Sequence, residues 1–127
     1  YLAASYLDLA WHSKNRKILD INKFEKKLFK SLKKPNEIDS RYGSTYFNHI
    51  FSGGYSSSYY SYMWSEVLDS SAFEVFEKKG LFHKSSGKKL KELVYSSGNS
   101  KNLMDQFIKF NGKKPDPKRL LQKRGLA

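Results

Sequence analysis

The pattern of hydrophobic and polar positions predicts a mainly α-helical chain with a short strand as its first element. In residues 2–12, Leu7, Leu9 and Trp11 alternate with small or charged residues. Such a two-residue period is typical of a strand, and a short helix is the alternative. Every later element is expected to be helical.

The first predicted helix starts after Asp20, a candidate N-cap. Apolar residues then recur at helical spacing as far as Leu32, and lysines occupy the other faces. Pro35 ends the pattern, because proline cannot continue a helix. Lysines opposite an apolar stripe are typical of a solvated surface helix, so we do not assign them a binding role.

Glycine, asparagine and proline divide the second half of the chain into further helices. These are expected over residues 57–79, 86–95, 100–110 and 117–123. Gly80 suits the C-terminal cap of the first of them. Asp116 suits the N-cap of the last, and Pro117 suits its first turn. A length of 127 residues fits one compact domain.

The centre of the chain is unusually aromatic and uncharged. Residues 42–65 contain no Lys, Arg, Asp or Glu, yet nine of these 24 residues are aromatic. The stretch is too rich in Ser, Gly and Asn for a membrane span, and too aromatic for a flexible linker. No part of the chain approaches the roughly 20 apolar residues that cross a bilayer.

Tyrosines in this stretch are spaced so that they could act together. Tyr55, Tyr59 and Tyr62 share one face if the helix reaches back to Tyr55. They are either half-exposed residues of a core or interface helix, or phenols that donate hydrogen bonds to a bound substrate. Gly53 and Gly54 favour the second interpretation, because a glycine turn lets a loop carry Tyr55 into a site.

The net charge of +12 invites a nucleic-acid interpretation, but the charge lies in the wrong place. Residues 40–77 contain one base, Arg41, against four acidic residues, so the aromatic centre is not positive. The charge distribution therefore argues against nucleic-acid binding. A basic helical module that binds another partner or associates with itself remains the alternative to an enzyme.

The residues of this chain do not make a complete enzyme by themselves. There is no HExxH, no two histidines lie four apart, and no phosphate loop, dinucleotide fingerprint or nucleophile elbow occurs. His49 is the only histidine near the aromatic stretch, and a lone histidine is more often structural than a ligand or base. We therefore assign no metal ligand in this chain. The lack of cysteine fits a cytoplasmic location.

One run of residues carries a resemblance to a known family. Residues 49–68 read HIFSGGYSSSYYSYMWSEVL, which resembles the C-terminal signature of the thimet oligopeptidase family, M3, of zinc metallopeptidases. The match continues through Phe76 to Gly80 and on to residues 124–126, and LDLAWH at residues 7–12 fits the preceding region.

The resemblance implies a role for each residue of the signature. His49 resembles the histidine that contacts the peptide near the scissile bond. Tyr55, after the glycine pair, resembles the tyrosine that closes over substrate. Tyr62 resembles the tyrosine that hydrogen-bonds the oxyanion, and Tyr59 resembles a further substrate contact.

The resemblance also implies what surrounds this chain. Residues 1–127 would form the C-terminal portion of a helical catalytic domain. In the parent enzyme, zinc would be bound by an HExxH helix and a later Glu, which would both precede residue 1 in the sequence. Short peptides would be the substrates, and the remainder of the catalytic domain would be the partner. Alone, the chain is expected to be inactive and able to self-associate, with no membrane partner.

Overall fold

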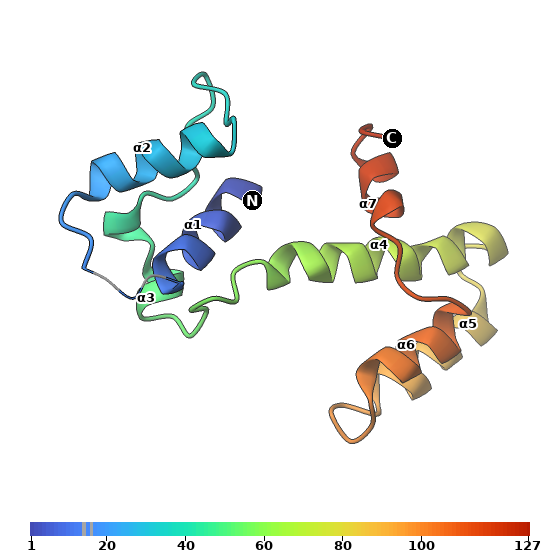
Figure 1. Ribbon diagram of the computed structural model, residues 1–127. Coiled ribbons are helices and arrows are strands. Elements are labelled where there is room, and N and C mark those ends of the chain that lie inside the picture. Colours follow the sequence, from blue (N-terminus) through green and yellow to red (C-terminus); the bar gives the residue numbers. More distant parts are fainter. Residues whose placement is uncertain (14, 16) are drawn as a thin grey trace. The chain divides into compact units, whose positions relative to one another are not determined.

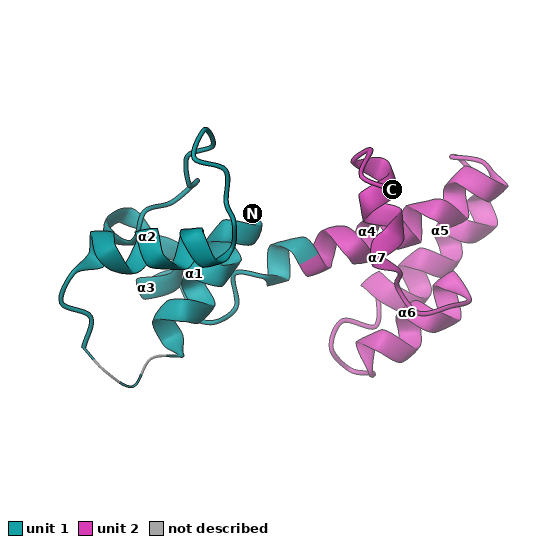
Figure 2. Ribbon diagram, turned by 45° about the horizontal axis from the view of Figure 1, so that its top comes forward, with its two compact units in different colours: residues 1–63 teal, residues 64–127 magenta. Residues whose placement is uncertain are grey.

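The computed structural model describes residues 1–13, 15 and 17–127. The chain divides into two compact units, residues 1–63 and 64–127 (Figure 2). The boundary falls within one helix.

Regular structure in the described residues consists of helices, without a strand (Figure 1). The elements in chain order are α1 (Leu2–His12), α2 (Ile21–Ser31), the 3₁₀ turn η1 (Ser44–Tyr46), α3 (Asn48–Phe51), α4 (Ser61–Lys79), α5 (Lys84–Leu90), the π-helical turn η2 (Lys91–Tyr95), α6 (Leu103–Asn111) and α7 (Pro117–Lys123). In the part of the chain described, no helix combines the length and the apolar character needed to cross a membrane. The prediction of a mainly α-helical chain is confirmed.

The first element is a helix, so the predicted N-terminal strand is wrong and its helical alternative is right. In α1, Ala4, Leu7 and Asp8 are buried, whereas Leu9 is 40% exposed. Positions three and four residues apart share a helix face, and this spacing explains the burial better than alternation does. The alternation was misleading because the buried face of α1 includes a charged residue.

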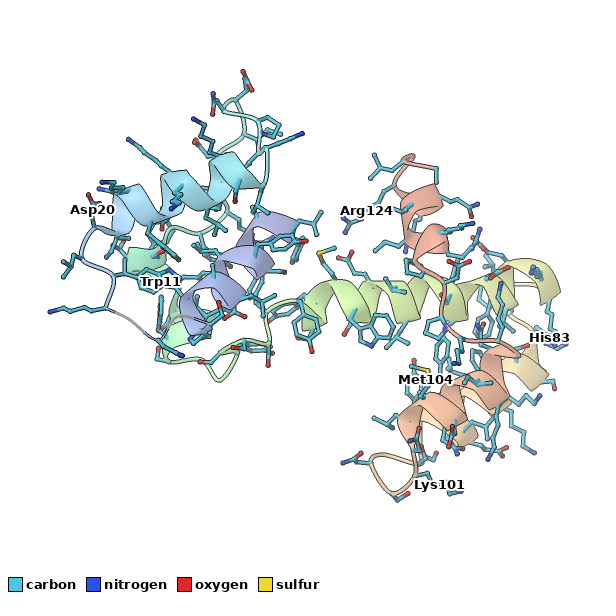
Figure 3. The ribbon with its side chains drawn as sticks, in the orientation of Figure 1. Trp11, Asp20, His83, Lys101, Met104 and Arg124 are labelled. Carbon is cyan, nitrogen blue, oxygen red and sulfur yellow. The ribbon has the colours of Figure 1, made fainter. Side chains whose placement is uncertain are left out.

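Helix α2 follows the prediction closely. The Asp20 side chain, labelled in Figure 3, accepts a hydrogen bond from the backbone N–H of Lys23 at 2.9 Å. The helix ends at Ser31, before Pro35. Phe24 and Leu28 pack against the core of the first unit, while the lysines of α2 face outwards.

The core of the first unit joins α1, α2 and the aromatic stretch. Its buried residues are Ala4, Leu7, Phe47, Ile50 and Tyr59. Trp11, labelled in Figure 3, lies 4.7 Å from Phe24 between ring centroids and donates a hydrogen bond to Ser44 Oγ at 2.7 Å. Helices α1 and α2 therefore form the support on which residues 44–62 are built.

Helix α4 begins later than predicted, at Ser61 instead of residue 57. Ser57 has a φ of +58°, in the left-handed region that a right-handed helix cannot include. Residues 56–60 form turns instead, so the prediction of a helix from residue 57 is wrong. Gly80 follows the helix with a φ of +103°, and its predicted place at the C-terminal end is confirmed.

In the second unit, the predicted helix over residues 86–95 is divided into α5 and η2. Helix α6 starts at Leu103, three residues later than expected, because Asn102 accepts the N-capping hydrogen bond from Asp105 N–H. Helix α7 has the predicted bounds, and Asp116 caps it through Lys118 N–H.

A charge cluster in the second unit predicts acid sensitivity. Nζ of Lys78 lies 2.6 Å from Glu74 Oε1, and Nζ of Lys113 lies 3.0 Å from Oε2. Hydrogen bonding to Lys78 and then to Lys113 lowers the pKa of Glu74 from its ordinary value of 4.5 to about 2. The folded state therefore favours the carboxylate more than the unfolded state does.

Glu74→Gln should consequently destabilise the protein near neutral pH but hardly at all in acid. A depressed carboxyl pKa stabilises the folded state above the unfolded pKa, and this stabilisation is lost as pH falls through the folded pKa. The difference from wild type in denaturant midpoint should shrink between about pH 4.5 and pH 2. Glu92→Gln, at an exposed pair with Lys88, is the control, and an equal pH dependence there would contradict the prediction.

Candidate functional site

The four side chains singled out by the sequence come together in the first unit. The ring centroid of His49 lies 5.8 Å from that of Tyr59, 6.1 Å from that of Tyr55 and 6.4 Å from that of Tyr62. Tyr55 stacks on Tyr62 at 5.2 Å, and Tyr59 lies 5.1 Å from Tyr62. We call these four residues the His–Tyr cluster.

A sharp turn, and not a helix, brings Tyr55 to the cluster. His49 is carried by α3, and the backbone N–H of Tyr55 donates to the His49 carbonyl at 3.0 Å. A Cβ added at Gly53 would lie 2.9 Å from His49 Cα and 3.0 Å from its carbonyl oxygen. Gly54 has a φ of +80°. The glycine pair is therefore required by close approach at the first position and by backbone conformation at the second.

Tyr59 forms the buried base of the cluster, with 2% of its surface exposed. Its ring packs at 4.9 Å against Phe47 and at 6.0 Å against Tyr42. Burial, and then the nearby Tyr42 phenol, raise the pKa of Tyr59 to about 12. Its phenol is therefore uncharged at neutral pH, and its predicted contact with substrate stays a prediction.

Tyr62 is the half-buried phenol beside this base. The Tyr55 hydroxyl next to it, and then burial, raise the pKa of Tyr62 above its ordinary value. This shift is away from neutral pH, where a phenol is already protonated, so Tyr62 can donate a hydrogen bond. Together with His49 and Tyr55, which are also half-buried, it presents polar groups suited to binding a carbonyl oxygen.

Sequence reasoning missed Asp8, which contacts the backbone of this region directly. The side chain is fully buried; Oδ1 accepts from Ser57 N–H at 2.8 Å, and Oδ2 accepts from Tyr59 N–H at 2.9 Å. His12 Nδ1 lies 2.8 Å from Oδ1. An Asp and a His one helical turn apart, in an otherwise apolar segment, were the available signal.

No three His, Cys, Asp or Glu side chains within residues 1–13, 15 and 17–127 are grouped so that they could hold a metal ion. The His–Tyr cluster contributes imidazole and phenol groups, without a carboxylate or a second histidine. These residues therefore fit the binding of a polar substrate better than they fit the binding of a metal.

Comparison with known proteins identifies the family. The sequence profile of peptidase family M3 matches residues 1–126. The chain belongs to peptidase family M3. This confirms the resemblance that was carried by residues 49–68.

Individual M3 relatives agree with this assignment. Dipeptidyl carboxypeptidase of Escherichia coli is 35% identical over 98% of this chain, and oligopeptidase A of the same organism is 40% identical over 63% of it. Thimet-like oligopeptidase of Dictyostelium discoideum is 36% identical over 72% of the chain. The matches cover 19%, 12% and 13% of these relatives, so the chain spans at most about a fifth of their length.

Proposed function

We propose that this chain supplies substrate-binding and oxyanion-stabilising residues to a zinc-dependent oligopeptidase that hydrolyses peptide bonds in short peptides. Membership of family M3 supports the reaction class. The observation that carries the assignment of the site is the His–Tyr cluster, in which Tyr55 stacks on Tyr62 beside His49.

Each member of the cluster has a role that suits its position. Tyr62 donates a hydrogen bond to the carbonyl oxygen of the scissile peptide, and this bond strengthens as the oxygen becomes negative. Tyr55 closes over the bound peptide, because its turn lies outside any helix. His49 contacts the peptide near the scissile bond. The ring of Tyr59 supports these groups from below and adds a substrate contact.

The zinc in this proposal belongs to the complete enzyme. Its ligands would come from residues outside 1–127, in the remainder of the catalytic domain, which is the partner of this chain. The roles above concern only hydrogen bonding and positioning by the side chains of this chain. Residues 1–127 then form the C-terminal portion of the catalytic domain, and the absence of cysteine supports a cytoplasmic enzyme.

Hydrolysis of a short fluorogenic peptide by the complete protein tests the proposal. We expect cleavage that a metal chelator abolishes and that added zinc restores, whereas residues 1–127 alone show none. Failure of the complete protein to cleave a panel of short peptides would contradict the proposal. Cleavage by residues 1–127 alone would contradict the inferred location of the zinc ligands. A basic, self-associating module would show no hydrolysis in either form.

A further inference from the structure

A buried carboxylate in α1 holds the loop that leads to Tyr62. Asp8 is fully buried, and each of its oxygens accepts one backbone N–H, from Ser57 at 2.8 Å and from Tyr59 at 2.9 Å. These contacts join positions 49 and 51 residues apart in the sequence. They are direct tertiary contacts to the backbone of the proposed site.

Burying a carboxylate is costly unless its oxygens are hydrogen-bonded, and here they are. His12 adds to this arrangement, because its Nδ1 lies 2.8 Å from Asp8 Oδ1 and 2.9 Å from the Asp8 carbonyl oxygen. The carboxylate oxygen and the carbonyl oxygen can only accept hydrogen bonds, so Nδ1 of His12 carries the proton and donates it. The carboxylate is thereby fixed in the orientation that suits the two amides.

The loop needs this support because its own conformation is unfavourable. Ser57 adopts a φ of +58°, which is disfavoured for any residue with a Cβ. The preceding residue bonds a second helix, because Ser56 Oγ donates to the Ile50 carbonyl of α3 at 2.7 Å. The loop is therefore bonded to both α1 and α3. Loss of the Asp8 carboxylate would leave the N–H groups of Ser57 and Tyr59 without their acceptors.

We propose that Asp8 is a positioning residue for peptide hydrolysis. It acts through the backbone amides of Ser57 and Tyr59 and so places the Tyr62 hydroxyl. This rests on the proposed function of Tyr62. Tyr59 stands three residues before Tyr62 and contacts its ring. A shift of about 1 Å in a catalytic group can cost about 100-fold in rate, so a loosened loop should reduce turnover.

Asp8→Asn in the complete protein is the first test. The amide has nearly the same size and keeps one acceptor oxygen, so one of the two backbone N–H groups loses its partner. We expect kcat to fall about 10-fold with a change in KM of less than about 2-fold, and exchange of the Ser57 or Tyr59 amide hydrogen to become about 10-fold faster. Unchanged kcat and unchanged exchange would overturn the proposal.

Glu25→Met is the matched control. The Glu25 carboxylate also accepts a backbone N–H, from Ser44, in the same unit but outside the segment of residues 55–60. Methionine has a similar length but no acceptor oxygen, so one backbone N–H loses its partner, as in Asp8→Asn, and kcat should stay unaltered. An equal fall in kcat would show that general weakening of this unit, and not placement of Tyr62, explains the effect.

A double-mutant cycle separates positioning from an independent structural role. In a Tyr62→Phe background the hydroxyl is already absent, so Asp8→Asn should lower kcat by less than about 3-fold. A full 10-fold loss in that background would overturn the proposal. If Asp8→Asn does not fold, His12→Ala removes only the bracing imidazole, and a fall in kcat of about 3-fold is expected; unchanged kcat would count against the proposal.

These outcomes are distinct from failure of the proposed function. Lack of peptidase activity in the wild-type protein, or full activity of Tyr62→Phe, would overturn the assigned chemistry. Amide exchange of Asp8→Asn does not depend on activity. Faster exchange at Ser57 or Tyr59, with α3 unchanged, would support the anchoring role of Asp8 even then, and unchanged exchange would overturn it.

Discussion

Tyr62→Phe in the complete protein should lower kcat for hydrolysis of a short peptide about 100-fold to 1000-fold, with a much smaller change in KM. The substitution removes one hydroxyl and leaves the ring, which can still stack on Tyr55 at 5.2 Å. A donor that matters most when the carbonyl oxygen is negative affects the transition state more than substrate binding. A phenol is already protonated at neutral pH, and the Tyr55 hydroxyl and burial shift the pKa of Tyr62 further from it.

Tyr60→Phe is the control for this experiment. Tyr60 lies two residues away, is 52% exposed and is not a member of the His–Tyr cluster. Deleting the same atom there should leave kcat and KM unchanged. The two variants are compared by steady-state kinetics. A wild-type kcat in Tyr62→Phe would contradict the role of Tyr62. So would a loss of kcat/KM that came entirely from a higher KM.

Elements with local signals could be predicted from the sequence. Asp20 caps α2 through Lys23 N–H, and Asp116 caps α7 through Lys118 N–H, so both helices start where the side chains indicate. Gly80 likewise follows α4 with a positive φ. In each case the deciding interaction lies within four residues, a range over which a sequence pattern is informative.

The two wrong element predictions share one long-range cause. Asp8 interrupts the apolar face of α1, and its carboxylate bonds hold the turn at Ser57 that delays α4. A pattern within α1 cannot show that a backbone segment about fifty residues away supplies the partners of Asp8. The sequence pattern therefore did not predict that Asp8 is buried. Nor did it predict that Ser57 has a positive φ within the expected helix.

The proximity of the four side chains in the His–Tyr cluster was predicted better than the local structure that brings them together. Tyr55 was expected to share a helix face with Tyr62 only if the helix reached back to it, and it arrives instead by the glycine turn outside α4. Its ring nevertheless stacks on Tyr62, because the glycine turn folds back onto α3 and Tyr55 N–H bonds the His49 carbonyl. The burial of Tyr59 depends on Phe47 and Tyr42, whose packing no spacing rule predicts.

Gly53→Ala should lower kcat/KM for peptide hydrolysis about 100-fold, because it displaces one side of the His–Tyr cluster. The new Cβ would lie 2.9 Å from His49 Cα and 3.0 Å from the His49 carbonyl oxygen. Both are backbone atoms, so no flexible side chain can move aside. Either α3 shifts with His49 or the turn shifts with Tyr55, and the hydrogen bond from Tyr55 N–H to the His49 carbonyl is lost.

Gly87→Ala provides the matched control, since a Cβ there meets no atom within 4 Å. Gly87 lies inside α5, where alanine is favoured by up to about 1 kcal/mol, so this variant should keep full activity and unfold at a slightly higher temperature. Kinetics of both variants, with circular dichroism to confirm folding, decide the matter. Wild-type kcat/KM in Gly53→Ala would mean that the approach of the turn to α3 is not required for catalysis, and that the glycine at this position serves the turn alone.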